Sequence, residues 1–256
     1  MSSLASYLMM LGNAAGLIGF IAFAHNKLGD YPKPLPKNKD TGKELIEALL
    51  IWGFVFTSVF VFVYYGWVLD SYYPYLPLGP LNIPLHSIIV LIFPVAFVTL
   101  VNHWGFADLG FRKSFYRKPA FFAIIIGLLW GIVPAFFETT SPIPVPLLLY
   151  YIYTPAFLEE LVHRGIIQSK LERALGQQKA WLLGGILFGL VHIPTDFFGP
   201  VAASYGDIMM SFLALAGQIA AGWFWGVLYI KTRNLIPCIA SHYLINFASG
   251  IIVWFM

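Results

Sequence analysis

Four ionisable side chains lie within six positions of one apolar stretch. The segment FLEELVHRG, positions 157–165, holds Glu159, Glu160, His163 and Arg164. Charges at membrane depth cost a few kcal/mol each and are retained when they are paired or face a cavity. Glu160 and Arg164 are four residues apart and would share one face of a helix, so we expect them to pair. Adjacent residues point about 100° apart, which leaves Glu159 free to face elsewhere, four residues before His163.

Two later apolar segments also carry isolated polar groups. LFGLVHIP, positions 187–194, contains His192, which is the next ionisable side chain after Lys179. SHYLINF, positions 241–247, contains His242 and Asn246, four residues apart and therefore on one face of a helix. These groups have the residue types that hydrolytic sites use.

Together these residue types suit hydrolysis. A carboxylate with a neutral imidazole can polarise a water molecule and later return its proton to a leaving amine. A second imidazole and an amide can donate hydrogen bonds to an oxyanion. The sequence has no G-x-S-x-G nucleophile elbow, and its single cysteine, Cys238, lies away from these segments and reads as a small packed side chain. We therefore expect water to attack an amide or ester inside the membrane.

The elements that would position these groups are membrane helices. The chain is 59% hydrophobic and 11% charged, with a mean hydropathy of +0.77, whereas soluble domains are roughly 25% charged. We predict an all-α integral membrane protein, a single transmembrane domain over residues 1–256. The eight apolar segments run near 4–24, 45–68, 84–103, 119–137, 146–168, 179–193, 208–230 and 235–255. The sixth is short for a full span and is expected to be tilted, broken or partly buried in protein.

Proline-rich stretches at 31–37, 73–84 and 141–146 separate several of these segments and are expected to be loops. Apart from Arg164, the basic residues cluster in the connections after the first, third, fifth and seventh segments. The other connections carry acidic residues, among them Asp70 and Asp207. Because positive loops stay in the cytoplasm, this alternation supports eight spans with both termini outside.

The polar groups are expected at a common depth. At about 1.5 Å per helical residue, Glu159, His192, His242 and Asn246 lie roughly 14–20 Å from the cytoplasmic basic residues Lys170, Lys179 and Arg233 that flank them. That depth is a little to the cytoplasmic side of the bilayer midplane. Three helices that bring polar groups to one depth indicate a shared cavity.

The motifs formed by these residues resemble those of the CPBP, or ABI, family of membrane proteases. EExxxR fits positions 159–164, FxxxH fits 188–192 and HxxxN fits 242–246, in that order. The best-known members are type II CAAX prenyl endopeptidases of the Rce1 kind. The resemblance covers mainly residues 146–250, which would be the catalytic core, and it implies an eight-helix bundle with a conical cavity open to the cytoplasm and laterally to lipid.

The resemblance implies a role for each motif position. Glu159 and His192 would activate the attacking water, and His242 and Asn246 would form the oxyanion site. The other two charged positions of the first motif, 160 and 164, would orient these groups and shape the substrate cleft. Phe188 is either a wall of the substrate cavity or a plain core residue.

In the EExxxR motif, Glu160 and Arg164 would thus support the catalytic groups rather than react themselves. The implied substrate is a prenylated protein or peptide with a CAAX-type end, from which the last three residues are removed. No metal and no cofactor are implied, because the HExxH motif of the zinc-dependent type I enzymes is absent. The small net charge of +3 gives no sign of nucleic-acid binding. Membrane lipid is the expected surrounding, and the sequence sets no oligomeric state.

The site would be reached from the cytoplasmic side, in the plasma membrane of a prokaryote or the endoplasmic reticulum of a eukaryote. Several alternatives remain. Glu159, His192 and His242 could instead form a three-ligand metal site. A protease of the same family could act on another membrane or leader peptide. Buried Glu, His and Arg also relay protons in transporters, although the internal repeat that many transporters show is missing. A further alternative is an inactive scaffold that kept the fold, but such a protein would not need all the residues of the three motifs.

Other polar residues are expected to be structural. Three histidines near segment ends are predicted at the membrane interface: His25, His86 and His103. His163, at a variable motif position, is predicted to pack or hydrogen-bond. Glu138 and Asp196 are predicted to be solvated loop charges.

Overall fold

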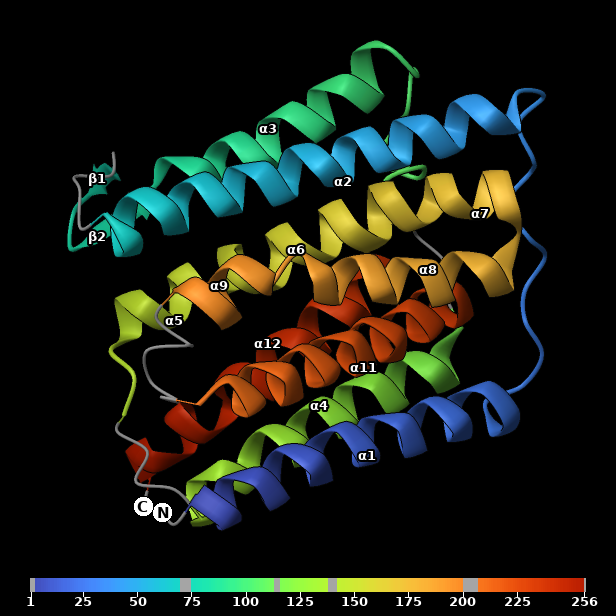
Figure 1. Cartoon of the computed structure of the whole chain (residues 1–256). Helices are drawn as coiled ribbons and strands as arrows, with labels where there is room; N and C mark the ends of the chain where they lie inside the picture. Colours follow the sequence, from blue (N-terminus) through green and yellow to red (C-terminus); the bar gives the residue numbers. More distant parts are fainter. Residues whose placement is uncertain (1–2, 70–74, 113–115, 138–141, 200–206, 256) are drawn as a thin grey trace.

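The computed structural model describes residues 3–69, 75–112, 116–137, 142–199 and 207–255. The described chain is a helical bundle with one short β-hairpin (Figure 1). The helices are α1 (Ser3–Lys27), α2 (Thr41–Val63), α3 (Leu85–Leu100), α4 (Arg117–Phe137), α5 (Val145–Tyr151), α6 (Leu158–Glu160), α7 (Ser169–Leu175), α8 (Gln177–Leu190), α9 (Ile193–Phe198), α11 (Ile208–Thr232) and α12 (Leu235–Ile252). The strands are β1 (Tyr75–Leu78) and β2 (Leu81–Pro84), and a 3₁₀ turn follows α12 at Val253–Phe255.

Each of the eight predicted apolar segments coincides with helix. Within the described residues, five helical stretches are long and apolar enough to cross a membrane, and α3 is a shorter apolar helix. One stretch spans Val145 to Leu175, where the π-helical segments Ile152–Phe157 and Leu161–Gln168 link α5, α6 and α7, but it is kinked at Thr154, whose backbone is extended (φ −136°, ψ 129°). The prediction of an all-α integral membrane protein is therefore confirmed.

Two predicted segment ends are moved by the structure. The fifth segment was expected to end near residue 168, but helix continues to Leu175 and buries Lys170 completely. The sixth was expected to be tilted, broken or partly buried, and helix α8 does break at Val191 and His192 before α9 begins. The longer fifth helix places Lys170 among neighbouring helices, and the break in the sixth does the same for His192.

Helices α11 and α12 lie in the middle of the bundle (Figure 1). Helix α11 packs on α8 and α1, and α12 packs on α4. Glycines make the close crossings possible, as is common between membrane helices. A Cβ on Gly222 of α11 would lie 2.6 Å from the carbonyl oxygen of Gly185 in α8. A Cβ on Gly127 of α4 would lie 2.7 Å from the carbonyl oxygen of Ser241 in α12.

The start of α12 is fixed by a tight connection. Arg233 has a φ of +55° and ends α11 in the left-handed conformation that is typical of helix C-termini. Asn234 then caps α12, and its side-chain oxygen accepts a hydrogen bond from the backbone N–H of Ile236 at 2.9 Å. The Arg233 guanidinium pairs with both carboxylate oxygens of Glu172 at 2.7 Å. His242 therefore projects from a helix whose first turn is firmly placed.

The proline-rich stretch at 73–84 is not only loop, which corrects the sequence prediction. Tyr75–Leu78 and Leu81–Pro84 pair as an antiparallel hairpin, with Leu78 opposite Leu81. Gly79 has a φ of +59°, and glycine at the first central position suits a two-residue hairpin turn. Period-two alternation is missing here, because the strand is exposed on both faces in β1.

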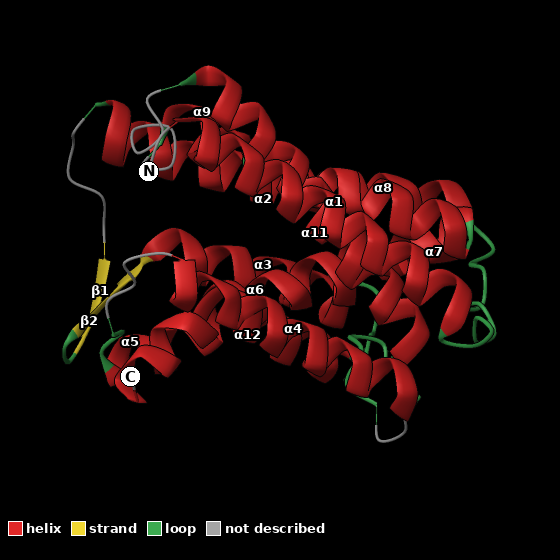
Figure 2. Ribbon diagram, turned by 90° about the horizontal axis from the view of Figure 1, so that it is seen from below, coloured by secondary structure: helices red, strands yellow, loops and turns green. Residues whose placement is uncertain are grey.

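The two ends of the bundle differ. Figures 1 and 2 both place the hairpin, α5, α9 and the first and last described residues at one end, and α7 at the other. At the α7 end, the buried Lys170 ammonium contacts Glu47 at 2.6 Å and Glu44 at 2.9 Å. These ion pairs hold α2 against α7 at the end that carries the basic connections.

Candidate active site

Glu159 lies between two histidines that come from different helices. Its Oε2 atom is 4.0 Å from His192 Nε2 and 3.9 Å from His242 Nε2. Both distances are too long for a direct hydrogen bond, but each can be bridged by one water molecule. The structure thus brings three of the four residues predicted to be catalytic to one point, with the Glu159 side chain 23% exposed.

The neighbouring Glu160 contacts His242 and Arg164 next to this point. Its Oε1 atom lies 2.9 Å from His242 Nδ1 and 3.3 Å from Arg164 Nη1. Glu160 is fully buried, and the predicted pairing with Arg164 is present. The contact with His242 was not predicted, because the two residues are 82 positions apart. A carboxylate only accepts, so Nδ1 of His242 carries the proton and its Nε2 is turned toward Glu159.

The second histidine is oriented by its own helix end. His192 Nδ1 lies 2.9 Å from the carbonyl oxygen of Phe188. Since a carbonyl oxygen only accepts, Nδ1 donates, and Nε2 of the neutral ring is left as an acceptor that faces Glu159. The Thr195 hydroxyl donates to the His192 carbonyl at 2.8 Å and fixes the break between α8 and α9. The break in the helix therefore aims the ring at the carboxylate.

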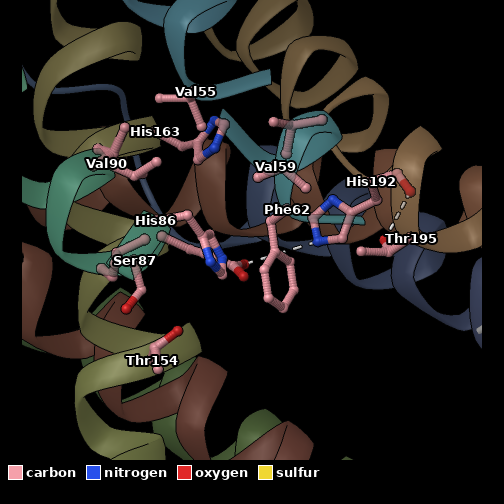
Figure 3. A pocket seen from close by; sticks show the side chains of 14 residues that line it. Val55, Val59, Phe62, His86, Ser87, Val90, Thr154, His163, His192 and Thr195 are labelled. Carbon is pink, nitrogen blue, oxygen red and sulfur yellow. Dashed lines mark hydrogen bonds and ion pairs between the residues drawn. The ribbon is translucent and has the colours of Figure 1, made fainter. Parts of the chain in front are cut away.

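A cavity of about 160 Å³ opens beside Glu159. Aliphatic residues of α2 and α3 form one wall, and the polar groups on its lining include His86, Ser87, Thr154 and Thr195. Figure 3 shows the rings of His86, His163 and His192 around this space, with Phe62 between them. The lining is thus apolar with a few convergent polar groups, which is typical of ligand sites.

Four polar lining residues were not predicted from the sequence to belong to the site. His86, which was predicted only to lie at the membrane interface, stacks its ring on Phe62 with a centroid distance of 4.0 Å and lines the cavity. Ser87, Thr154 and Thr195 line it too. None belongs to a motif. The first turn of α3 reaches the site only because the hairpin between α2 and α3 returns the chain to that depth, which hydropathy does not indicate.

Two predicted site residues lie elsewhere. Asn246 is exposed one helical turn after His242 and is not among the lining residues. Phe188 is 1% exposed and does not line the cavity, because it is packed behind it. Its ring lies edge-on to His163, at 5.1 Å between centroids, and the Arg164 guanidinium carbon lies 4.1 Å above it. Phe188 therefore positions charged and aromatic neighbours instead of meeting substrate directly.

Two other expectations have mixed outcomes. His163 packs against Phe188 as predicted, but it also lines the cavity, and its Nδ1 atom has no hydrogen-bond partner among the described residues. The prediction of a solvated Asp196 is wrong, because the residue lies in α9 and is 2% exposed. Glu138 lies outside the described residues.

The cavity lies toward the hairpin end of the bundle. Its lining comes from Val55 onward in α2, from the first turns of α3, and from Thr195 of α9. No residue of α7 or of the first half of α2 lines it. At the other end, the ion pairs of Lys170 with Glu44 and Glu47 hold α2 against α7.

The arrangement also bears on a metal site. Among the residues that the structure describes, no group of three His, Cys, Asp or Glu side chains is placed to hold a metal ion. The three-ligand alternative of Glu159, His192 and His242 stays a prediction.

Comparison with protein families finds one match. Residues 141–248 match the family described as type II CAAX prenyl endopeptidase Rce1-like. This range contains all three motifs and both histidines that flank Glu159. Comparisons with the curated proteins and with the solved structures gave no match. Residues 141–248 of this integral membrane protein are therefore similar to the Rce1-like family of type II CAAX prenyl endopeptidases.

Proposed function

We propose that the protein is a metal-independent intramembrane endopeptidase that removes the C-terminal tripeptide of prenylated CAAX-type proteins. The observation that carries the proposal is the position of Glu159, whose Oε2 atom has a water-sized gap to each of two imidazole nitrogens. The chemistry belongs to a partly wet site within an apolar bundle, where charged groups are retained for function.

The first step is attack by water. A water molecule between Glu159 and His192 gives one proton to the Glu159 carboxylate and donates its other hydrogen to His192 Nε2. The oxygen attacks the scissile carbonyl carbon, and the carbonyl oxygen becomes an oxyanion. When the C–N bond breaks, the protonated Glu159 returns the proton to the leaving amine.

The oxyanion needs donors, and His242 supplies one when its ring is cationic. Its Nδ1–H donates to the buried Glu160 carboxylate, so a second proton on Nε2 can be donated to the oxyanion. The buried set is then electrically balanced, because Glu159 and Glu160 offset Arg164 and the imidazolium. Asn246, one turn further along α12, would add a second donor once substrate covers that exposed face.

The substrate would arrive with its prenyl chain in the lipid and its C-terminal peptide in the cavity. The basic connections support a cytoplasmic position for the α7 end and extracytoplasmic termini. The membrane would be the plasma membrane in a prokaryote and the endoplasmic reticulum in a eukaryote. The whole chain would act as one transmembrane domain, with residues 146–250 as its catalytic core.

Cleavage of a farnesylated CAAX peptide by the purified protein in liposomes tests the proposal. Glu159→Gln is expected to lower kcat by at least about 1000-fold, because the group that takes and returns the proton is lost. His103→Asn, a change at an exposed residue away from the cavity, is the matched control and should keep full activity. Full activity in Glu159→Gln would exclude the mechanism.

A second candidate within the same family is a protease for another membrane or leader peptide. The observation that favours it is the position of the cavity toward the hairpin end, away from the basic connections. Mass spectrometry of products from a panel of prenylated, unprenylated and membrane-embedded peptides distinguishes the two. Cleavage that needs neither the prenyl group nor the CAAX end would favour the second candidate.

A further inference from the structure

A second cavity lies at the opposite end of the bundle from the hairpin. It has a volume of about 360 Å³ and shares no lining residue with the Glu159 cavity. Residues 28–32 after α1 and residues 116–119 at the start of α4 form its walls, and Lys231 near the end of α11 completes it. All three segments are helix ends, so the cavity lies at the level where membrane helices meet the polar interface.

The lining of this cavity is positively charged. Arg117 and Lys118 are exposed, and Lys231 is 2% exposed. Asp30 is the one carboxylate among the lining residues. Burial raises the pKa of Tyr31 to about 12, so its phenol stays neutral at physiological pH and adds no negative charge. The cavity therefore carries an excess of positive charge.

Lys231 is held in an unusual way for a buried cation. Its ammonium donates to the backbone carbonyl oxygens of Gly29 and His25 and lies 4.0 Å from the centre of the Tyr31 ring. These contacts hold the side chain in place without an ion pair, and the Asp30 carboxylate, which also lines the cavity, attracts its charge from a greater distance. Removing a charge from water is costly unless an opposite charge lies close. A site of this kind favours an anion in the adjoining cavity.

The other buried cations of the described residues show the contrast. Arg164 pairs with Glu160, Lys170 with Glu44 and Glu47, and Arg233 with Glu172. Lys231 forms no ion pair with a carboxylate among the residues that the structure describes. At Lys231 the direct carboxylate contact found at the other three positions is replaced by the weaker attraction of Asp30.

We propose that this cavity binds the phosphate-bearing head group of an anionic phospholipid. Arg117, Lys118 and Lys231 would contact the phosphate, because basic pockets between membrane helices suit anionic head groups. The adjoining surface favours a lipid over a free phosphate. Helix α4 continues from the cavity with an exposed apolar face on which an acyl chain can lie: Phe121, Ile124, Ile125 and Leu128.

Native mass spectrometry of the protein in nanodiscs of phosphatidylcholine with phosphatidylglycerol tests the site. We expect the double variant Arg117→Gln/Lys118→Gln to bind phosphatidylglycerol about tenfold or more weakly than the wild type, since each basic contact at a membrane surface contributes to binding. The control Lys37→Gln/Lys39→Gln removes two exposed cations that do not line the cavity and should bind like the wild type. Equal binding by all three proteins, or equal loss in both variants, would overturn the proposal.

Thermal unfolding in neutral detergent separates the possible sources of the phosphate. A rise in Tm with phosphatidylglycerol, but not with glycerol 3-phosphate, supports a lipid site. A rise with glycerol 3-phosphate of the same size overturns the lipid assignment, and no rise with either overturns the site. Lys231→Met should abolish the rise, and cleavage of the farnesylated peptide in the Arg117→Gln/Lys118→Gln variant shows that the protein is still folded.

Discussion

Glu159 and Glu160 are neighbours in sequence with different surroundings. The Glu159 side chain is 23% exposed beside the cavity, whereas Glu160 is fully enclosed by His242 and Arg164. One helical step of about 100° separates them. The first can exchange protons with water, and the second provides a fixed negative charge that orients the imidazole.

Glu160→Gln removes that fixed charge while keeping nearly the same shape. We expect kcat to fall about 100-fold with a small change in KM, because His242 loses the partner that stabilises its cationic form. Unfolding should also cost about 3–5 kcal/mol less, since Arg164 is left buried without its carboxylate. Kinetics and thermal unfolding measure the two effects, and restored activity in Glu160→Asp would indicate that charge rather than packing matters. Unchanged kcat in Glu160→Gln would contradict the positioning role.

At this scale the sequence predicts what is local. The Glu160–Arg164 pair follows from a spacing of four residues, and the motif spacing indicates His192 and His242. The Glu160–His242 contact and the inclusion of His86 depend on how distant helices are packed. Periodicity contains no information on that packing.

At the scale of the elements, the position of α12 is set by contact with α4. The backbone of Ser241 lies against Gly127, and the next residue is His242. Because the nearest neighbours of a Cβ at Gly127 would be backbone atoms of Ser241, they cannot move aside without moving the helix. A single methyl group can therefore displace the histidine.

Gly127→Ala is expected to reduce kcat about 100-fold, since a shift of about 1 Å in a catalytic group has an effect of this size. The control Gly217→Ala lies in α11, where a Cβ meets nothing within 4 Å, and it should keep wild-type activity. Peptide cleavage and Tm measure both variants. Full activity in Gly127→Ala would show that α12 tolerates the shift.

The eight apolar helical segments were predictable because a bilayer requires long apolar segments. The residues at which the helices end were harder to predict. Lys170 reads as a loop cation in the sequence, yet it extends the helix because Glu44 and Glu47 pair with it across the bundle. The hairpin was missed for a similar reason, since exposed strands lack an apolar alternation.

At the scale of the whole molecule, the two ends of the bundle are held differently. Ion pairs between buried side chains join α2 and α7 at one end, whereas the cavity separates α2 and α3 from Glu159 toward the other. We expect the paired end to stay fixed when substrate enters.

Lys170→Met tests this anchoring. The variant leaves Glu44 and Glu47 buried without their partner, so the free energy of unfolding should fall by about 3–5 kcal/mol. Lys39→Met, at an exposed residue, should change it by about 0.5 kcal/mol or less. Denaturant unfolding in mild detergent measures the difference. Equal stability of the two variants would show that the ion pairs do not anchor the bundle.

The first and last described residues, Ser3 and Phe255, share the end of the bundle that carries the hairpin (Figure 1). Any affinity tag or fluorescent fusion attached there is carried beside the half of the molecule that contains Glu159. Immobilising the enzyme on a bead through such a tag would crowd that half, whereas a label in the connection between α1 and α2 would leave it open.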